Sequence, residues 1–111
     1  MTIQAKPTKW RSFPDPRKQG MLVAPFGPGC YDIRHNRKKV CCGSGGHVAQ
    51  RMTSLLPPPL GAGTRNNSRK RQYVEDNIAH IEYRTFACGT VSEAKALEAK
   101  LRAQRGYLFP T

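Results

Sequence analysis

GCYDIRHNRKKVCCGSGGHVAQR, residues 29–51, carries the strand, turn and helix signals that decide the fold. Two short runs compatible with β-structure, GCYDIR and KKVCCG, are separated by His35-Asn36-Arg37, a pattern typical of an antiparallel hairpin. The glycine-rich segment 43–46 then ends the second strand. From Val48 onward apolar residues recur at i, i+4, i+7 and i+8, the spacing of a helix with one buried face. The stretch therefore predicts a hairpin followed by a helix.

The elements expected after this helix complete a small mixed fold. PPPLGAG, residues 57–63, ends the first helix because its prolines cannot continue it. A second helix is expected over residues 64–80 and a third strand over HIEYRTFAC, residues 80–88. Inward residues of the second helix are predicted to be Tyr73, Val74 and Ile78.

The last helix, over residues 90–106, has the clearest boundaries. Thr90 and Glu93 form a capping box at its start, and Gly106 is its stop. Its apolar stripe is Val91, Ala94, Leu97 and Leu101. We therefore predict an α/β (α+β) fold, a small three-stranded antiparallel sheet flanked by three helices in the order β-β-α-α-β-α.

Chain length favours one domain, since 111 residues leave no room for a second core. Residues 1–25 mix prolines, cations and scattered apolar side chains without a period, so we expect a basic, proline-containing lead-in or tail from which Trp10 and Phe13 dock on the core. The domain proper is expected over residues 26–111. The sequence has neither the apolar core of a signal peptide nor a run of about 18 apolar residues, so we expect a cytoplasmic protein with no membrane partner and with reduced thiols.

Charge points to a polyanionic partner. Lys and Arg number 19 against 7 Asp and Glu, which gives a formal net charge of +12. An excess of this size attracts nucleic acid over a Debye length, although a solvated basic surface or a ribosome-type binder would have the same composition. In the second helix the cations precede Glu75 and Asp76, which is unfavourable for the helix dipole and favours contact with phosphates. The predicted nucleic-acid-binding residues are Arg65, Arg69, Lys70 and Arg71.

Two further charged residues occupy unusual places. Glu98 falls inside the apolar arc of the last helix, so its carboxylate must be paired, lie at the edge of the core, or hold a metal ion. Arg51 lies at the border of the apolar face of the first helix, where it either extends its guanidinium to solvent or grips phosphate oxygens.

Taken together these residues resemble the GIY-YIG nuclease superfamily over about residues 26–111. Gly29-Cys30-Tyr31 is similar to the first motif of the family, and Cys41-Cys42-Gly43 is similar to the second. Arg51 follows Gly43 by eight residues, the spacing of the catalytic arginine, and Glu98 matches the metal-binding glutamate.

The resemblance implies an endonuclease that hydrolyses phosphodiester bonds, in DNA rather than RNA, with one Mg²⁺ or Mn²⁺ ion held by Glu98. Tyr31 would activate or position the attacking water, and Arg51 would steady the charged phosphate. Cys41 departs from the pattern, because the second motif usually has tyrosine there. Either Cys41 is a plain strand residue, or His47 on the following loop supplies the missing proton-transfer group.

Two other interpretations remain open at this point. The chain could be a catalytically weak or inactive module that keeps the fold and the basic surface and only binds nucleic acid. Alternatively, Cys30, Cys41, Cys88 and a histidine could form a zinc site, although the cysteines lack the paired spacing of such sites.

Overall fold

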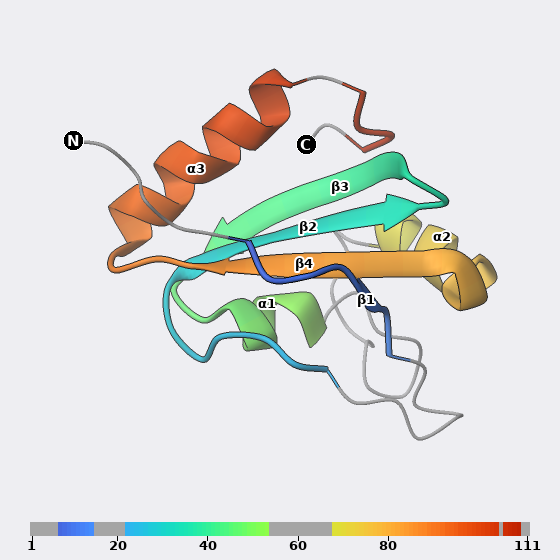
Figure 1. Ribbon diagram of the computed structural model, residues 1–111, viewed down its shortest axis with the longest axis horizontal. Helices are drawn as coiled ribbons and strands as arrows, with labels where there is room; N and C mark the ends of the chain where they lie inside the picture. The colour runs from blue at the N-terminus through green and yellow to red at the C-terminus, as the bar shows by residue number, and fades with distance from the viewer. Residues whose placement is uncertain (1–6, 15–21, 54–67, 105, 110–111) are drawn as a thin grey trace.

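An antiparallel sheet lies at the centre of the computed structural model, which describes residues 7–14, 22–53, 68–104 and 106–109 (Figure 1). Within these residues the sheet has four strands in the order β1-β4-β2-β3. The strands are β1 (Arg11–Ser12), β2 (Gly29–His35), β3 (Lys38–Gly45) and β4 (Ile81–Ala87). The predicted α+β class is confirmed. The sheet has one strand more than the three expected, because β1 adds to the edge of β4.

The predicted hairpin of β2 and β3 closes on Asn36 and Arg37, whose φ angles are 50° and 70°. Two consecutive left-handed residues are the signature of the tight turn that matches strand twist, and asparagine tolerates this conformation well. The pairing passes from Ile33 opposite Cys41 to Arg34 opposite Lys39, so the hairpin contains a bulge.

Helices cover both faces of the sheet. α1 (Val48–Thr53) and α2 (Ser68–Asp76) contribute Val48, Met52 and Val74 to one core cluster. α3 (Val91–Ala103) contributes Ala94 and Leu101 to the other cluster. A 3-10 turn, η3 (Ile78–His80), leads into β4.

The faces of β3 follow the alternation expected of a strand. Cys41 belongs to the cluster under α1 and α2, whereas Cys42 belongs to the cluster under α3. The two adjacent cysteines therefore point to opposite sides of the sheet.

Several element ends differ from the sequence-based expectation. α2 ends at Asp76 rather than continuing to residue 80, because Asn77 donates its side-chain amide to the carbonyl of Tyr73 and the chain tightens into η3. Residues 54–67, which include Leu55, Leu56 and Arg65, lie outside the described residues. The predicted inward residues of α2 pack as expected, with Val74 fully buried.

α3 begins as predicted, with Thr90 accepting a hydrogen bond from the backbone N–H of Glu93. The Glu93 carboxylate accepts from the N–H of Gly89 rather than from that of Thr90. Val91 is 42% exposed, so its inclusion in the buried stripe was wrong. It lies in the first turn, where α3 has not yet reached the sheet core.

The N-terminal segment is part of the fold over residues 7–14. Phe13 is only 3% exposed and packs edge-on against Tyr83, with ring centres 5.8 Å apart. The docking expected of Phe13 is thus confirmed, and β1 places Trp10 beside the sheet.

Candidate functional site at the end of β3

Tyr31 lies on β2 with its ring over Gly43 of β3, its partner in the pairing register. A Cβ atom at residue 43 would come within 2.5 Å of the Tyr31 hydroxyl oxygen, so this position needs glycine. Burial raises the pKa of Tyr31 above its ordinary value, while the positive charge of Arg51 opposes the rise. Tyr31 is therefore a protonated phenol at neutral pH.

Glu98 projects from α3 toward Ser44, the next residue of β3. The Ser44 hydroxyl donates to Oε1 at 2.5 Å, and Nη2 of Arg102 approaches Oε2 at 2.5 Å. The Glu98 side chain is 17% exposed. Of the three alternatives expected for this carboxylate, namely a paired acid, an edge position and a metal ligand, the structure shows pairing, since both oxygens are engaged.

The Glu98 carboxylate fits a magnesium-type ion in its chemistry. Such an ion keeps several waters and often takes only one or two protein carboxylates together with substrate phosphates. Arg102 competes with such an ion for the Glu98 carboxylate, and the Arg102 side chain is 40% exposed. An exposed pair spaced four residues apart on a helix contributes about 0.3–0.5 kcal/mol, so a cation could displace Arg102 at little cost.

Arg51 lies on α1 against Gly45, the last residue of β3. Its Cβ, Cγ and Cδ atoms would be 3.7–3.8 Å from a Cβ atom at Gly45, so its aliphatic stem runs along the strand end. The residue is exposed. This is the arrangement expected of an arginine that buries its stem and presents its guanidinium at the surface.

The segment Gly43-Ser44-Gly45 is therefore contacted by Tyr31, Glu98 and Arg51, three of the four residues predicted for catalysis and metal binding; the fourth is His47. Tyr31 and Arg51 approach from the side of α1, and Glu98 approaches from the side of α3. The charges of Arg51 and Glu98 both affect the pKa of Tyr31, so the three groups share one electrostatic environment.

His47 immediately precedes α1 and caps it. Its Nδ1 accepts the backbone N–H of Gln50 at 3.0 Å, and its ring packs against Phe26 with centres 5.4 Å apart. In the neutral imidazole that accepts through Nδ1, the proton is on Nε2. The basic nitrogen is thus already engaged, and the geometry favours a structural role for His47 over proton transfer.

Cys41 lies fully inside the core, and burial raises its pKa to about 12. The thiol therefore stays protonated at neutral pH, and it lies in the same buried cluster as Tyr31. Cys30 lies in the opposite cluster, with Cys88 packed against it, so Cys30, Cys41 and Cys88 cannot bind one zinc ion and that interpretation is wrong. No group of three or more metal-binding side chains occurs in the described part of the chain.

The cations of α2 are not next to this site. Arg69 is exposed, and Lys70 and Arg71 are partly exposed. α2 is tied to the hairpin end of the sheet, where the hydroxyl of Tyr73 is 2.7 Å from Nδ1 of His35. The candidate site lies toward the other end of β2, about 13–20 Å from His35 at the usual strand rise.

Sequence reasoning missed Ser44 and Arg102, the two partners of Glu98. The spacing of four residues between Glu98 and Arg102 was a readable signal, because such residues are neighbours on a helix. Ser44 had no such signal, since its contact with Glu98 joins residues 54 apart in the chain.

Comparison with known proteins finds no relative of this chain. No family model matches the chain, and neither a curated protein nor a solved structure matches it. Among the described residues, no helix has the length and apolar character needed to cross a membrane.

Proposed function

We propose that this chain is a GIY-YIG-type endonuclease that hydrolyses phosphodiester bonds, in DNA rather than RNA, with the help of Mg²⁺ or Mn²⁺. The observation that carries the proposal is the convergence of Tyr31, Arg51 and Glu98 on residues 43–45. The three residues come from three different elements, β2, α1 and α3.

Each residue has a role that its surroundings allow. Glu98 would hold the divalent ion, which supplies Lewis-acid stabilisation of the phosphate charge when bound. Tyr31, kept protonated by burial, donates a hydrogen bond that orients the attacking water. Arg51 binds phosphate oxygens through its guanidinium.

The electrostatics of the whole chain support a nucleic-acid partner. The formal net charge is +12, and Arg69, Lys70 and Arg71 gather in the first half of α2. The separation of about 13–20 Å between the site and the hairpin end of the sheet, where α2 is tied, corresponds to about four to six nucleotides at 3.4 Å per nucleotide, so one bound strand can contact both. All four thiols are free, which supports the reducing conditions of a cytoplasm.

A second candidate, a module that binds nucleic acid without cutting it, is favoured by two observations. Cys41 lies in the core in place of the second tyrosine, and Arg102 neutralises Glu98. Both features are expected of a chain that has kept the fold after losing catalysis.

Cleavage of plasmid, branched DNA, single-stranded DNA and RNA distinguishes the two candidates. Each substrate is incubated with Mg²⁺, with Mn²⁺ and with EDTA. A nuclease gives metal-dependent cutting that Glu98→Gln lowers by roughly 10²-fold or more, as expected for removal of a group acting on the transition state. Glu75→Gln, the same change on α2, serves as the matched control and should cut normally.

Salt-sensitive binding without cutting of any substrate would establish the binding module instead. Equal cutting by the two variants would refute the assignment of Glu98, and a chain that neither binds nor cuts would refute both candidates.

A further inference from the structure

Trp10 lies against two arginines from neighbouring strands. Cζ of Arg34, on β2, is 4.0 Å from the centre of the Trp10 ring, and Cζ of Arg84, on β4, is 4.7 Å from it. Arg84 also lies over Phe86, at 5.2 Å from the ring centre. We call Trp10, Arg34, Arg84 and Phe86 the Trp10 platform.

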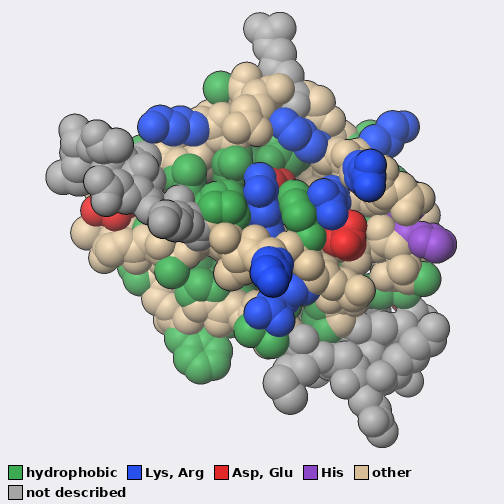
Figure 2. Space-filling model, in the orientation of Figure 1, with side chains coloured by type: hydrophobic (Ala, Val, Ile, Leu, Met, Phe, Trp, Pro, Cys, Tyr) green, Lys and Arg blue, Asp and Glu red, His purple; other side chains and the backbone are tan. Residues whose placement is uncertain are grey.

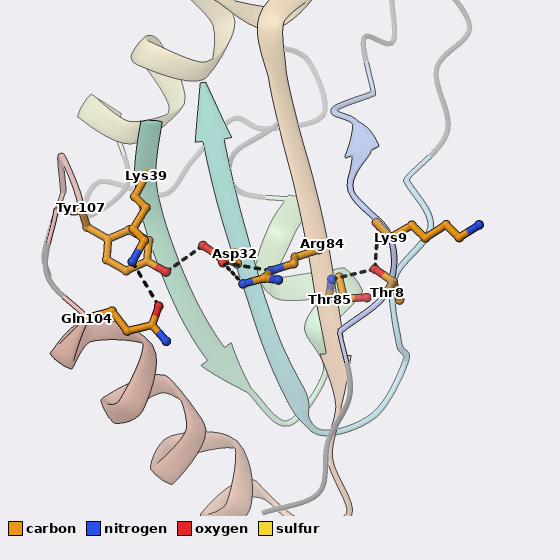
Figure 3. A network of polar contacts seen from close by, with 8 residues as sticks. All are labelled: Thr8, Lys9, Asp32, Lys39, Arg84, Thr85, Gln104 and Tyr107. Carbon is orange, nitrogen blue, oxygen red and sulfur yellow. Dashed lines mark hydrogen bonds and ion pairs between the residues drawn. The ribbon is translucent and has the colours of Figure 1, made fainter. Parts of the chain in front are cut away.

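Carboxylates fix both guanidinium groups in the plane of their N–H bonds. Glu82 accepts from Nε of Arg34 at 2.9 Å. Asp32 accepts from Nε of Arg84 at 3.1 Å and lies 3.0 Å from its Nη2. Asp32 is 2% exposed and also accepts the hydroxyl of Tyr107 at 2.8 Å, so the arginine is anchored to the core (Figure 3).

This anchoring has a geometric consequence. Because the carboxylates bind the edges of the guanidinium groups, Arg34 and Arg84 stack through their flat faces, and both lie over the Trp10 ring. The two side chains are 24% and 25% exposed, so the platform is accessible to a ligand.

The platform lies on a part of the sheet that α3 does not cover. α3 packs on β3 and β2, while β4 and β1 run beside it (Figure 1). Lys and Arg side chains gather over this face with hydrophobic side chains between them (Figure 2). Lys9 is exposed and extends its amine away from the sheet, and Arg102 is exposed on the α3 side.

We infer that the Trp10 platform is a binding site for unpaired bases of single-stranded nucleic acid. This inference rests on nucleic acid being the partner in the proposed function, and it adds a ligand class and a surface apart from Glu98. Bases stack on aromatic rings and on guanidinium planes, and a neighbouring cation such as Lys9 attracts the phosphates.

The chemistry favours a single strand over a duplex. In a duplex the faces of the bases are already stacked on their neighbours, so they cannot stack on a protein ring. A platform built from planar groups with their edges occupied offers few donors for reading base edges or gripping phosphates. Its complementary ligand is therefore a strand with exposed base faces.

Trp10 makes the test direct because it is the only tryptophan in the chain. Its fluorescence is titrated with an oligothymidylate and an oligouridylate of about 12 nucleotides, within the site size of small single-strand binders. A duplex at equal phosphate concentration is the third arm. We expect quenching by the single strands and little change with the duplex, and the stronger single-stranded quencher identifies DNA or RNA as the better ligand.

Variants then test the platform by anisotropy of a labelled oligonucleotide. Trp10→Ala should weaken single-strand binding roughly 5- to 150-fold, whereas Trp10→Phe should retain most of it. Arg34→Gln should weaken binding more than Arg37→Gln, a matched loss of charge at the exposed hairpin turn. Thermal unfolding of each variant establishes that it is folded.

Three results would overturn the inference. They are no single-strand binding, binding that leaves Trp10 emission unchanged, and equal effects of Arg34→Gln and Arg37→Gln in folded proteins. Glu98-dependent cutting is measured on the same preparations. Cutting that persists while the platform fails rejects the platform and leaves the proposed nuclease function intact.

Discussion

Replacing Gly43 by alanine should disturb the candidate site in a way that the structure quantifies. A Cβ atom at residue 43 would lie 2.5 Å from the hydroxyl oxygen of Tyr31, 2.6 Å from its Cζ and 2.7 Å from its Cε1. The contact is with a rigid ring that is only 3% exposed, so the ring or the strand must move. Overpacking of this kind costs about 1–3 kcal/mol in the free energy of unfolding.

An opposing term comes from the unfolded chain. Alanine restricts it more than glycine does, which stabilises the protein by about 0.4–1 kcal/mol where the native conformation is allowed. Gly43 does not have a positive φ, so this term applies. The net expectation is a loss of about 1–2 kcal/mol, which lowers Tm by about 4 °C for each kcal/mol in a domain of this size.

Gly45→Ala is the matched control, two residues along the same strand. Its new Cβ atom would meet the Arg51 side chain at 3.7–3.8 Å, an ordinary van der Waals contact. We expect this variant to be neutral or slightly stabilised. Urea unfolding of the two variants and the parent measures the difference. Equal stabilities for the two variants would refute the placement of the Tyr31 ring over Gly43.

Four further outcomes can be measured on the same protein. Asp32→Ala removes the buried acceptor of Arg84 and Tyr107 and should lower the free energy of unfolding in urea by about 2–4 kcal/mol. The loss is smaller than for a fully buried pair because Arg84 is 25% exposed. A loss below about 1 kcal/mol, on the order of one hydrogen bond, would contradict the network. Thr90→Ala should cost about 1 kcal/mol by loss of the α3 cap, and Thr90→Ser should restore it. Arg102→Ala should leave stability nearly unchanged but lower the Mn²⁺ concentration needed for cutting, and an unchanged metal requirement would argue against Glu98 as the ligand. Burial raises the pKa of Cys30 and Cys41 from 9.0 to about 12, so the unfolded chain loses these protons at lower pH than the folded chain does. The free energy of unfolding should therefore be retained below pH 9.0 and fall as the pH rises from 9.0 toward 12. A flat profile over that interval would contradict the burial of the two thiols.

Local signals predicted the elements well where a short segment contained the whole cause. Asn36 and the flanking strands specified the hairpin, and Thr90 specified the start of α3. The end of α2 was predicted less well, because the chain tightens at Asn77 through a contact with the backbone of Tyr73 that no periodicity reveals. The strand β1 was missed because two residues flanked by prolines and cations carry no alternation, and its stability comes from pairing with β4.

The residues of the candidate site also differ in whether a short segment of sequence is enough to predict them. Glu98 and Arg51 could be selected from the sequence because each is a charge on or near an apolar helix face. The Ser44 partner of Glu98 could not be selected, since it reaches Glu98 only after β3 and α3 have packed.

The sequence by itself determined the secondary structure around residues 29–51, the capped last helix and the basic character, because each depends on neighbouring residues or on composition. Only the tertiary structure decided that Tyr31, Arg51 and Glu98 all lie against residues 43–45 of β3, that Cys41 is enclosed in the core, and that Trp10 lies against arginines of two neighbouring strands. The physical reason is that these contacts join residues far apart in the chain. They form when whole faces of the sheet and helices are buried together, and no short segment contains that information.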